Sequence, residues 1–188
     1  MKWQSPNHIQ SREYTCGYCG KVVASASGFF SDLQTFLYIC PHCKKPSYFE
    51  NDKQVPGVAP GAEVRHLPAG IEALYREARN CVSVGSNTAA VLTCRKLLMN
   101  IAVAQKADEN KPFVYYVQFL ADQGYVPPNG KGWVDHIRNK GNEANHEIQL
   151  MNQPDAEELI SFCEMLLKFI YEFPNRVPKA KVDKAPMA

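Results

Sequence analysis

The spacing of apolar residues changes along this chain and divides it into two parts. From about residue 70 onwards, apolar residues recur every three or four positions, which places them on one side of an α-helix. The segment before residue 53 lacks this spacing and contains short β-prone stretches, TFLYIC at 35–40 and SYF at 47–49. We therefore expect a small β-rich module at 1–52 and a helical bundle at 70–175.

Five amphipathic segments make up the predicted bundle. They begin near Ile71, Ser86 or Asn87, Pro112, Trp133 and Pro154. The last segment has the longest apolar stripe, which consists of Leu159, Phe162, Cys163, Leu166, Phe169, Ile170 and Phe173. Amphipathic helices joined by mostly short connections are typical of helical bundles. The expected fold class is therefore mainly α, with a small β-rich module at the N-terminus.

Two segments show neither pattern. The stretch 53–70 contains three prolines and three glycines, which predicts a linker at 53–69. Residues 176–188 carry four Lys or Arg against one Asp or Glu, and we expect a disordered basic tail there.

Composition narrows the classes of function. The 188 residues are 45% hydrophobic and carry a formal net charge of +2, with the cations spread along the chain. Tight nonspecific DNA binding needs a denser cationic patch, so we do not expect it. The apolar runs are shorter than the roughly 20 residues of a membrane span, and the first residues lack the apolar core of a secretory signal. We expect a cytoplasmic protein without a membrane association.

Four of the seven cysteines form two CxxC pairs separated by 20 residues: Cys16 and Cys19, then Cys40 and Cys43. Two tight turns of this kind supply four thiolates to one tetrahedral Zn²⁺. Because four thiolates leave no open coordination position, we expect one structural zinc per chain. Cationic and aromatic residues beside the second pair are candidates for contact with nucleic acid or a protein: Lys44, Lys45, Tyr48 and Phe49. The alternative is a solvated turn over a minimal core.

Polar residues follow the edge of one predicted helix, in WVDHIRNKGNEANHEIQ at 133–149. Arg138, Asn142 and His146 lie four positions apart, next to the apolar side of the helix. A guanidinium, an amide and an imidazole in one row can hold a phosphate and move a proton. Alternatively, Asn142 and His146 cap a helix end or form hydrogen bonds in the core.

Two segments, TAAVLTCRKLL at 88–98 and HIRNKGNEANH at 136–146, followed by a C-terminal helix, resemble an uncharacterised bacterial domain of the HEPN-like superfamily. The resemblance covers about residues 65–174. It implies a HEPN-like helical bundle, with the zinc ribbon as an N-terminal addition also seen in such proteins. It also implies a homodimer formed through the bundle, in which the motifs of two subunits face each other.

Active HEPN ribonucleases cleave RNA without a metal, using an arginine, a following polar residue and a histidine that is separated from the arginine by four to six residues. The resemblance assigns these places to Arg138, Asn139 and His146. His146 would move a proton, Arg138 would stabilise charge on the phosphoryl group, and Asn142 would orient the histidine or bind a phosphate oxygen. Arg95 is a further candidate for phosphate contact, and its alternative is a surface or helix-bridging arginine.

The interval between the arginine and the histidine separates two hypotheses. Seven residues lie between Arg138 and His146, one more than the usual maximum in active members. This departure favours a noncatalytic module that binds nucleic acid or protein, in phage defence or a toxin-type stress response. A metal-independent endoribonuclease that uses the Arg138/His146 pair at a dimer interface is the alternative.

Overall fold

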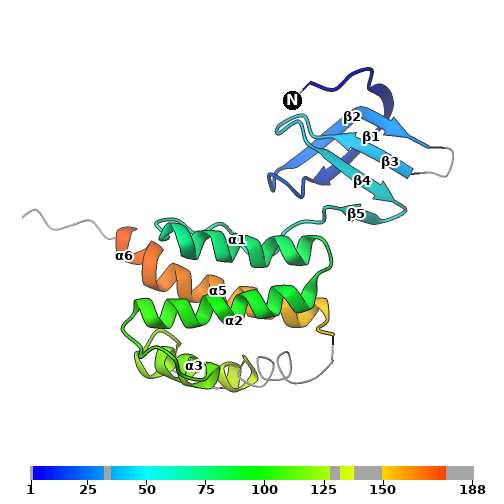
Figure 1. Cartoon of the computed structure of the whole chain (residues 1–188). Helices are drawn as coiled ribbons and strands as arrows, with labels where there is room; N and C mark the ends of the chain where they lie inside the picture. The colour runs from blue at the N-terminus through cyan, green and yellow to red at the C-terminus, as the bar shows by residue number, and fades with distance from the viewer. Residues whose placement is uncertain (1, 32–34, 128–131, 138–149, 177–188) are drawn as a thin grey trace, which may run out of the picture.

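The computed structural model describes residues 2–31, 35–127, 132–137 and 150–176, which form an antiparallel sheet followed by packed helices (Figure 1). The strands are β1 (Asn7–Thr15), β2 (Val22–Phe30), β3 (Thr35–Ile39), β4 (Pro46–Glu50) and β5 (Lys53–Val55). Each strand pairs with the next one along the chain. The sheet is therefore a five-stranded meander.

The predicted fold class, mainly α with a small ribbon, is wrong, because the protein is mixed α and β with about 47% helix and 20% strand. The pattern of the sequence did not reveal β1 and β2, which are nine residues each. Residues 24–28 of β2 are all Ala, Ser or Gly, which have little strand preference, and most of β1 is polar. Both segments form strands because each places a few side chains, such as Tyr14 and Val23, in a shared core.

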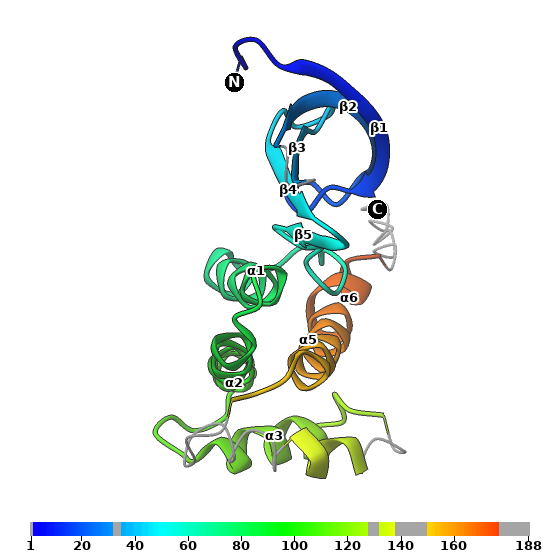
Figure 2. The same ribbon diagram turned by 90° about the vertical axis from the view of Figure 1, so that its right-hand side faces the viewer.

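The sheet curves around its own small core (Figure 2). Three aromatic rings meet there edge to face, with centroids 5.1 Å apart for Tyr14 and Phe49 and 5.6 Å apart for Tyr38 and Phe49. Phe49 is only 2% exposed. Of the two aromatic residues predicted as partner contacts, Phe49 and Tyr48, only Tyr48 therefore reaches the surface.

Gly28 allows β2 and β3 to approach each other closely, because a Cβ there would lie 1.9 Å from the carbonyl oxygen of Leu37.

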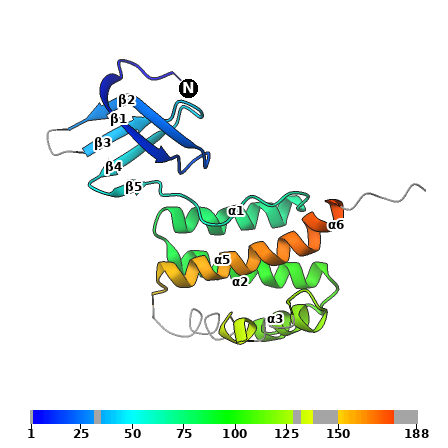
Figure 3. The ribbon, with the colours of Figure 1, turned by 180° about the vertical axis from the view of Figure 1, so that it is seen from behind.

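The helices pack below the sheet. They are α1 (Ala69–Ser83), α2 (Asn87–Ala104), α3 (Phe113–Asp122), α5 (Gln153–Leu167), the π-helical segment η2 (Lys168–Glu172) and α6 (Phe173–Arg176). Residues 132–137 are also helical. Helices α1, α2 and α5 pack against one another, and α3 lies against α2 on the side away from the sheet (Figures 1 and 2). Seen from behind, α5 runs in the same direction as α2 (Figure 3).

The core of the helical part lies mainly between α2 and α5. Its fully buried side chains include Leu97, Leu98, Ile101, Leu159, Ile160, Phe162 and Leu166. Phe169 and Phe173 continue the apolar stripe in the sequence, yet they are 49% and 39% exposed. The cause is η2, because a π-helical turn holds more residues than an α-helical turn and rotates the stripe. Within the described ranges, no helix is long and apolar enough to cross a membrane.

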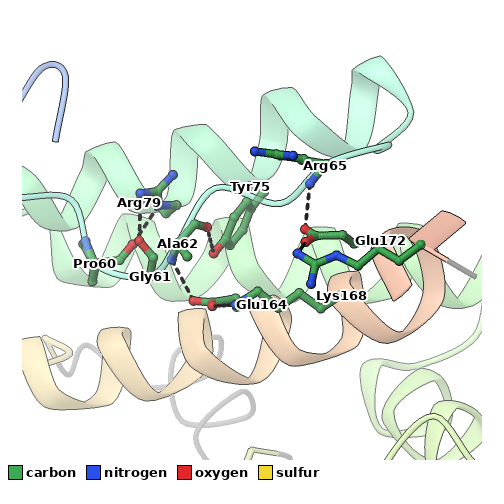
Figure 4. A network of polar contacts seen from close by, with 10 residues as sticks. Pro60, Gly61, Ala62, Arg65, Tyr75, Arg79, Glu164, Lys168 and Glu172 are labelled. Carbon is green, nitrogen blue, oxygen red and sulfur yellow. Dashed lines mark hydrogen bonds and ion pairs between the residues drawn. The ribbon is translucent and has the colours of Figure 1, made fainter. Parts of the chain in front are cut away.

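The segment predicted as a linker, 53–69, begins with β5 and then lies along α1 and α5 (Figure 4). The hydroxyl of Tyr75 in α1 donates to the carbonyl of Ala62 at 2.9 Å. The guanidinium of Arg79 donates to the carbonyls of Pro60 and Gly61 at 2.7 and 2.8 Å. Helix α1 therefore holds this segment at three consecutive carbonyl groups.

Two glutamates hold the other side of the same segment (Figure 4). Glu164 of α5 accepts a hydrogen bond from the backbone N–H of Ala62 at 2.8 Å. Glu172 of η2 accepts one from the backbone N–H of Arg65 at 2.9 Å, although Glu172 is only 3% exposed. A buried carboxylate is stable only when it is paired and hydrogen-bonded, and Glu172 is both, because the Arg176 guanidinium also donates to it. The segment between sheet and helices is thus fixed from both sides.

Candidate metal centre and adjoining cleft

The two CxxC pairs lie in equivalent turns, one after β1 and one after β3. In the first turn, the N–H of Gly20 donates to the carbonyl of Cys16 at 2.8 Å. In the second, the N–H of Lys44 donates to the carbonyl of Cys40 at 2.9 Å. Gly20 and Lys44 both have a positive φ, of 65° and 61°. The two turns therefore share one backbone conformation.

The four thiols of the pairs come together, and their sulfur atoms all lie within 4.8 Å of one another. The Sγ atoms of Cys16 and Cys43 are 3.7 Å apart, and those of Cys19 and Cys40 are 3.9 Å apart. In a tetrahedron with Zn–S bonds of about 2.3 Å, sulfur atoms stand about 3.8 Å apart. A disulfide would need about 2.05 Å. The spacing therefore suits a metal ion held by four sulfurs, as the sequence predicted.

Backbone groups prepare this cluster for metal binding. Burial raises the pKa of the Cys40 thiol, but hydrogen bonds from the backbone N–H groups of Cys43 and His42 and with the thiols of Cys43 and Cys16 together bring that pKa down to about 7. Burial and hydrogen bonding among the neighbouring thiols raise the pKa of Cys43 to about 12. The two thiols of the second pair thus have pKa values shifted in opposite directions. Because metals bind thiolate, loading the site releases protons.

A cleft of about 660 Å³ separates the first CxxC turn from α1. Its polar and aromatic lining includes Tyr18, Lys45, Arg76, Glu77 and Asn80. The ring of Tyr18 is 48% exposed, and the ammonium of Lys45 lies 4.7 Å from its centroid. A second hollow of about 380 Å³ shares Tyr18, Arg76 and Asn80 and reaches the metal-binding turn. The metal centre therefore borders a concave surface that combines a ring with charged groups.

The predicted row Arg138, Asn142 and His146 lies outside the described residues, as does Asn139. The helical residues 132–137 come directly before this row. The ring of Trp133 packs on Phe162 with centroids 4.9 Å apart, and His136 Nε2 lies 2.9 Å from a carboxylate oxygen of Glu158. These contacts attach the start of the predicted segment to α5. The catalytic roles of the row stay a prediction.

Arg95 is described, and it is 9% exposed on α2. Its guanidinium lies 4.2 Å from the centroid of the Phe113 ring, so it connects α2 with the start of α3. Burial lowers its pKa. Among the described residues, none accepts a hydrogen bond from its Nη1. The arginine is thus a desolvated cation with an unused donor, and its contact with phosphate stays a prediction.

The cleft contains residues that sequence reasoning missed. Tyr18 lies inside a predicted metal-binding turn. An aromatic residue at that place could have been recognised from the sequence as a candidate for contact with a ligand. Arg76 and Asn80 lie one turn apart on the polar side of α1, where they are indistinguishable from ordinary solvated residues. Only the tertiary structure brings them to Tyr18.

The sheet and the packed helices define a mixed α/β protein with a cluster of four cysteines that could hold a metal ion. Beyond this class, the chain belongs to a family described as a domain of unknown function, DUF4145, which matches residues 76–185. The match begins inside α1 and includes the helices that follow, but not the sheet. It agrees with the resemblance to an uncharacterised domain, while the relation to the HEPN-like superfamily stays a prediction. No curated protein and no solved structure matches the chain.

Proposed function

We propose that this protein is a noncatalytic nucleic-acid-binding module whose sheet is held by one structural Zn²⁺. The observation that carries the proposal is the exposed ring of Tyr18 with the Lys45 ammonium 4.7 Å from its centroid, on the metal-binding turns. A ring and a cation together offer stacking for a base and attraction for a phosphate. This pairing suits binding by a few local contacts, in keeping with a net charge of only +2.

The donor set supports a structural role for the metal. Four thiolates fill a tetrahedral coordination sphere and leave no position for water or substrate. The ion would connect the turn after β1 with the turn after β3, because each turn supplies two of the sulfurs. Its chemistry would be to hold the turns that carry Tyr18 and Lys45 in place.

The proposal includes a homodimer formed through the helical part. Phe169 and Phe173 support it, because their rings lie on the surface in edge-to-face contact with centroids 5.3 Å apart. Contiguous exposed apolar surface marks association sites, and these two rings are contiguous. Sedimentation of the wild type and of Phe169→Glu over a range of concentrations tests this part, and a wild type that stays monomeric would refute it.

Binding of labelled RNA and DNA to the zinc-loaded full chain, followed by fluorescence anisotropy, tests the function. We expect micromolar or tighter binding that weakens with salt, and its loss when a chelator removes the zinc. Absence of binding by folded, zinc-loaded protein would overturn the proposal and favour a protein partner.

A second candidate is the metal-independent endoribonuclease. It is favoured by Arg95, since a buried guanidinium with an unused Nη1 donor is suited to an anion. The test is incubation of the wild type and His146→Ala with RNA in excess EDTA. Fragments with 2′,3′-cyclic phosphate ends, formed by the wild type alone, would replace the noncatalytic proposal.

A further inference from the structure

We infer that the cleft between the first CxxC turn and α1 binds single-stranded nucleic acid, with a base stacked on Tyr18 and the adjoining phosphates held by Lys45 and Arg76. The inference rests on the proposed function and adds two things to it. It names the binding site, and it names unpaired strands as the ligand.

The two cations of the cleft stand on opposite walls. Lys45 comes from the second CxxC turn, while Arg76 comes from α1. The only salt bridge of Arg76 in the described part of the chain is a 3.9 Å contact with Glu72, and the side chain is 66% exposed. A surface pair of this length contributes little, so the Arg76 guanidinium is available to a phosphate. A strand lying between the walls would meet a positive charge on each side.

The size of the cleft and the exposure of the ring favour an unpaired strand. A volume of about 660 Å³ is that of a pocket for a small ligand, in the range that suits a nucleotide unit. In a duplex the faces of the bases are covered by their neighbours, so a protein ring can stack only on an unpaired or terminal base. The Tyr18 ring, which is 48% exposed, therefore selects single strands.

The polar lining favours a base over an acidic peptide. Asn80 offers an amide that both donates and accepts, and Glu77 offers a carboxylate that only accepts. The edge of a base carries both donors and acceptors, and a carboxylate can accept from an amino group such as that of cytosine. An ionised acidic side chain only accepts hydrogen bonds, so it offers no donor to the Glu77 carboxylate. The mixed lining therefore matches a nucleotide better than an acidic segment.

Hydrogen bonds and close packing fix the two walls relative to each other. The backbone N–H of Gly57 donates to the carbonyl of Ser83, at the end of α1, at 2.7 Å. Gly17 packs so closely that a Cβ would lie 2.4 Å from the carbonyl oxygens of both Pro56 and Gly57. The cleft is thus formed before a ligand arrives, and a preformed site loses less free energy to ordering on binding.

The test uses labelled 12-nucleotide oligouridine and oligothymidine, and the duplexes that they form with their complements. For the zinc-loaded wild type we expect at least tenfold tighter binding of the single strands than of the duplexes. Comparison of the RNA strand with the DNA strand shows whether the sugar matters. Tyr18→Ala should weaken single-strand binding about tenfold or more, because the stacking face is removed. Arg76→Ala should weaken it several-fold and make it less dependent on salt, because one phosphate contact is lost.

Two matched controls lie away from the cleft. Phe30→Ala removes an exposed ring from β2 of the same sheet, and Lys96→Ala removes an exposed cation from α2. Both should bind within about twofold of the wild type, since neither residue lines the cleft. Tyr18→Phe keeps the ring and should also bind like the wild type. Zinc content of one per chain confirms that each Tyr18 variant is folded.

The outcomes separate this inference from the proposed function. If the wild type binds single strands but Tyr18→Ala and Arg76→Ala bind equally well, the cleft is not the site, while the nucleic-acid function stands. Equal affinity for duplexes and single strands would overturn the selection of unpaired bases. If the wild type binds neither, both proposals fall together.

Discussion

The sheet and the helical part of this molecule obtain their stability from different sources. Among the described residues, the sheet's core consists of seven buried side chains, two of which, Cys16 and Cys40, are proposed metal ligands. The core of the helical part consists of 28 buried side chains. A domain as small as the sheet rarely buries enough apolar surface to fold without a metal or disulfides. The small core of the sheet supports the proposal that a metal ion stabilises it, whereas the helical part has a large core of its own.

This difference matters for binding, because the cleft takes one wall from each part. Under the proposed function, Tyr18 and Lys45 would depend on the metal for their positions, whereas Arg76 and Asn80 depend on the packing of α1. Loss of the metal should therefore remove the ring from the cleft and leave the cation of α1 in place. The following predictions test how independent the two parts are.

Removal of the metal should have the largest effect. With a strong chelator, we expect the sheet to unfold while the helical circular dichroism at 222 nm stays nearly unchanged. Structural zinc contributes on the order of 10 kcal/mol to small zinc-dependent folds. Cys43→Ser should act like the chelator, and metal analysis should find one zinc per chain in the wild type but none in Cys43→Ser. Cys81→Ser is the control, since Cys81 lies on α1 outside the cluster. Simultaneous loss of the helices would show that the two parts are not independent.

A cavity in the helical core should destabilise the helices and leave zinc binding unchanged. Leu98 is fully buried in α2, and Leu98→Ala should lower the free energy of unfolding of the helices by about 2–5 kcal/mol. Leu92→Ala on the same helix should change it by less than about 0.5 kcal/mol, because Leu92 is 40% exposed. Urea unfolding at 222 nm measures both. We expect zinc release to need the same chelator concentration in both variants, and an earlier release in Leu98→Ala would contradict the comparison.

Acid should weaken the connection between the parts. The backbone N–H of Arg65, and then the guanidinium of Arg176, hold the pKa of Glu172 below its usual value of 4.5. Because the pKa is lower in the folded state, ionised Glu172 stabilises the fold above the unfolded pKa, and this contribution is lost as the pH falls through the folded pKa.

Glu172→Gln should therefore lower the urea midpoint of the helices at pH 7, and the difference from the wild type should shrink as the pH falls below about 4.5. We expect a smaller effect than for Leu98→Ala. Glu109→Gln, at an exposed position before α3, serves as the control for the loss of one carboxylate. A difference for Glu172→Gln that is the same at every pH would show that the ionised carboxylate is not the source.

The sequence predicted those parts of the structure that depend on neighbouring residues. Helical periodicity is local, so the apolar stripes of α1, α2, α3 and α5 could be recognised. The CxxC spacing is local too, and it predicted the cluster of four cysteines. Strands β1 and β2 were missed because pairing with distant residues, rather than intrinsic preference, makes them strands. The exposure of Phe169 and Phe173 depends on one π-helical turn, which no residue pattern indicated.

The cleft could not be predicted from the sequence either, because it too depends on contacts between distant residues. Tyr18 and Arg76 are far apart in the sequence, and each is an ordinary surface residue by itself. They meet because Gly57 and residues 60–65 are hydrogen-bonded to the helices, which fixes the approach of the sheet. The predicted row from Arg138 to His146 remains a sequence-based hypothesis, since it lies outside the described residues.

The smallest predicted effects come from the same substitution, glycine to alanine, made once in the sheet and once in the helical part. Gly20→Ala adds a methyl group where φ is +65° and no atom lies within 4 Å, so backbone strain alone should cost about 1 kcal/mol. Gly70→Ala adds the same group in the first turn of α1, where the backbone is helical and no atom lies within 4 Å. There alanine should stabilise by up to about 1 kcal/mol. The change in the sheet should lower resistance to chelators, and the change in the helix should raise the urea midpoint at 222 nm.

Lys44 provides the reverse experiment in the second turn. It occupies the place of Gly20 with a φ of 61°, and a lysine there bears a strain that glycine does not. Lys44→Gly should therefore make the zinc harder to remove, by up to about 1 kcal/mol after allowance for the greater freedom of glycine in the unfolded chain. Competition with a chromophoric chelator measures this, and unfolding at 222 nm should not change. If Lys44→Gly weakened zinc binding instead, the lysine side chain rather than the backbone would govern that turn, and the two turns would not be equivalent.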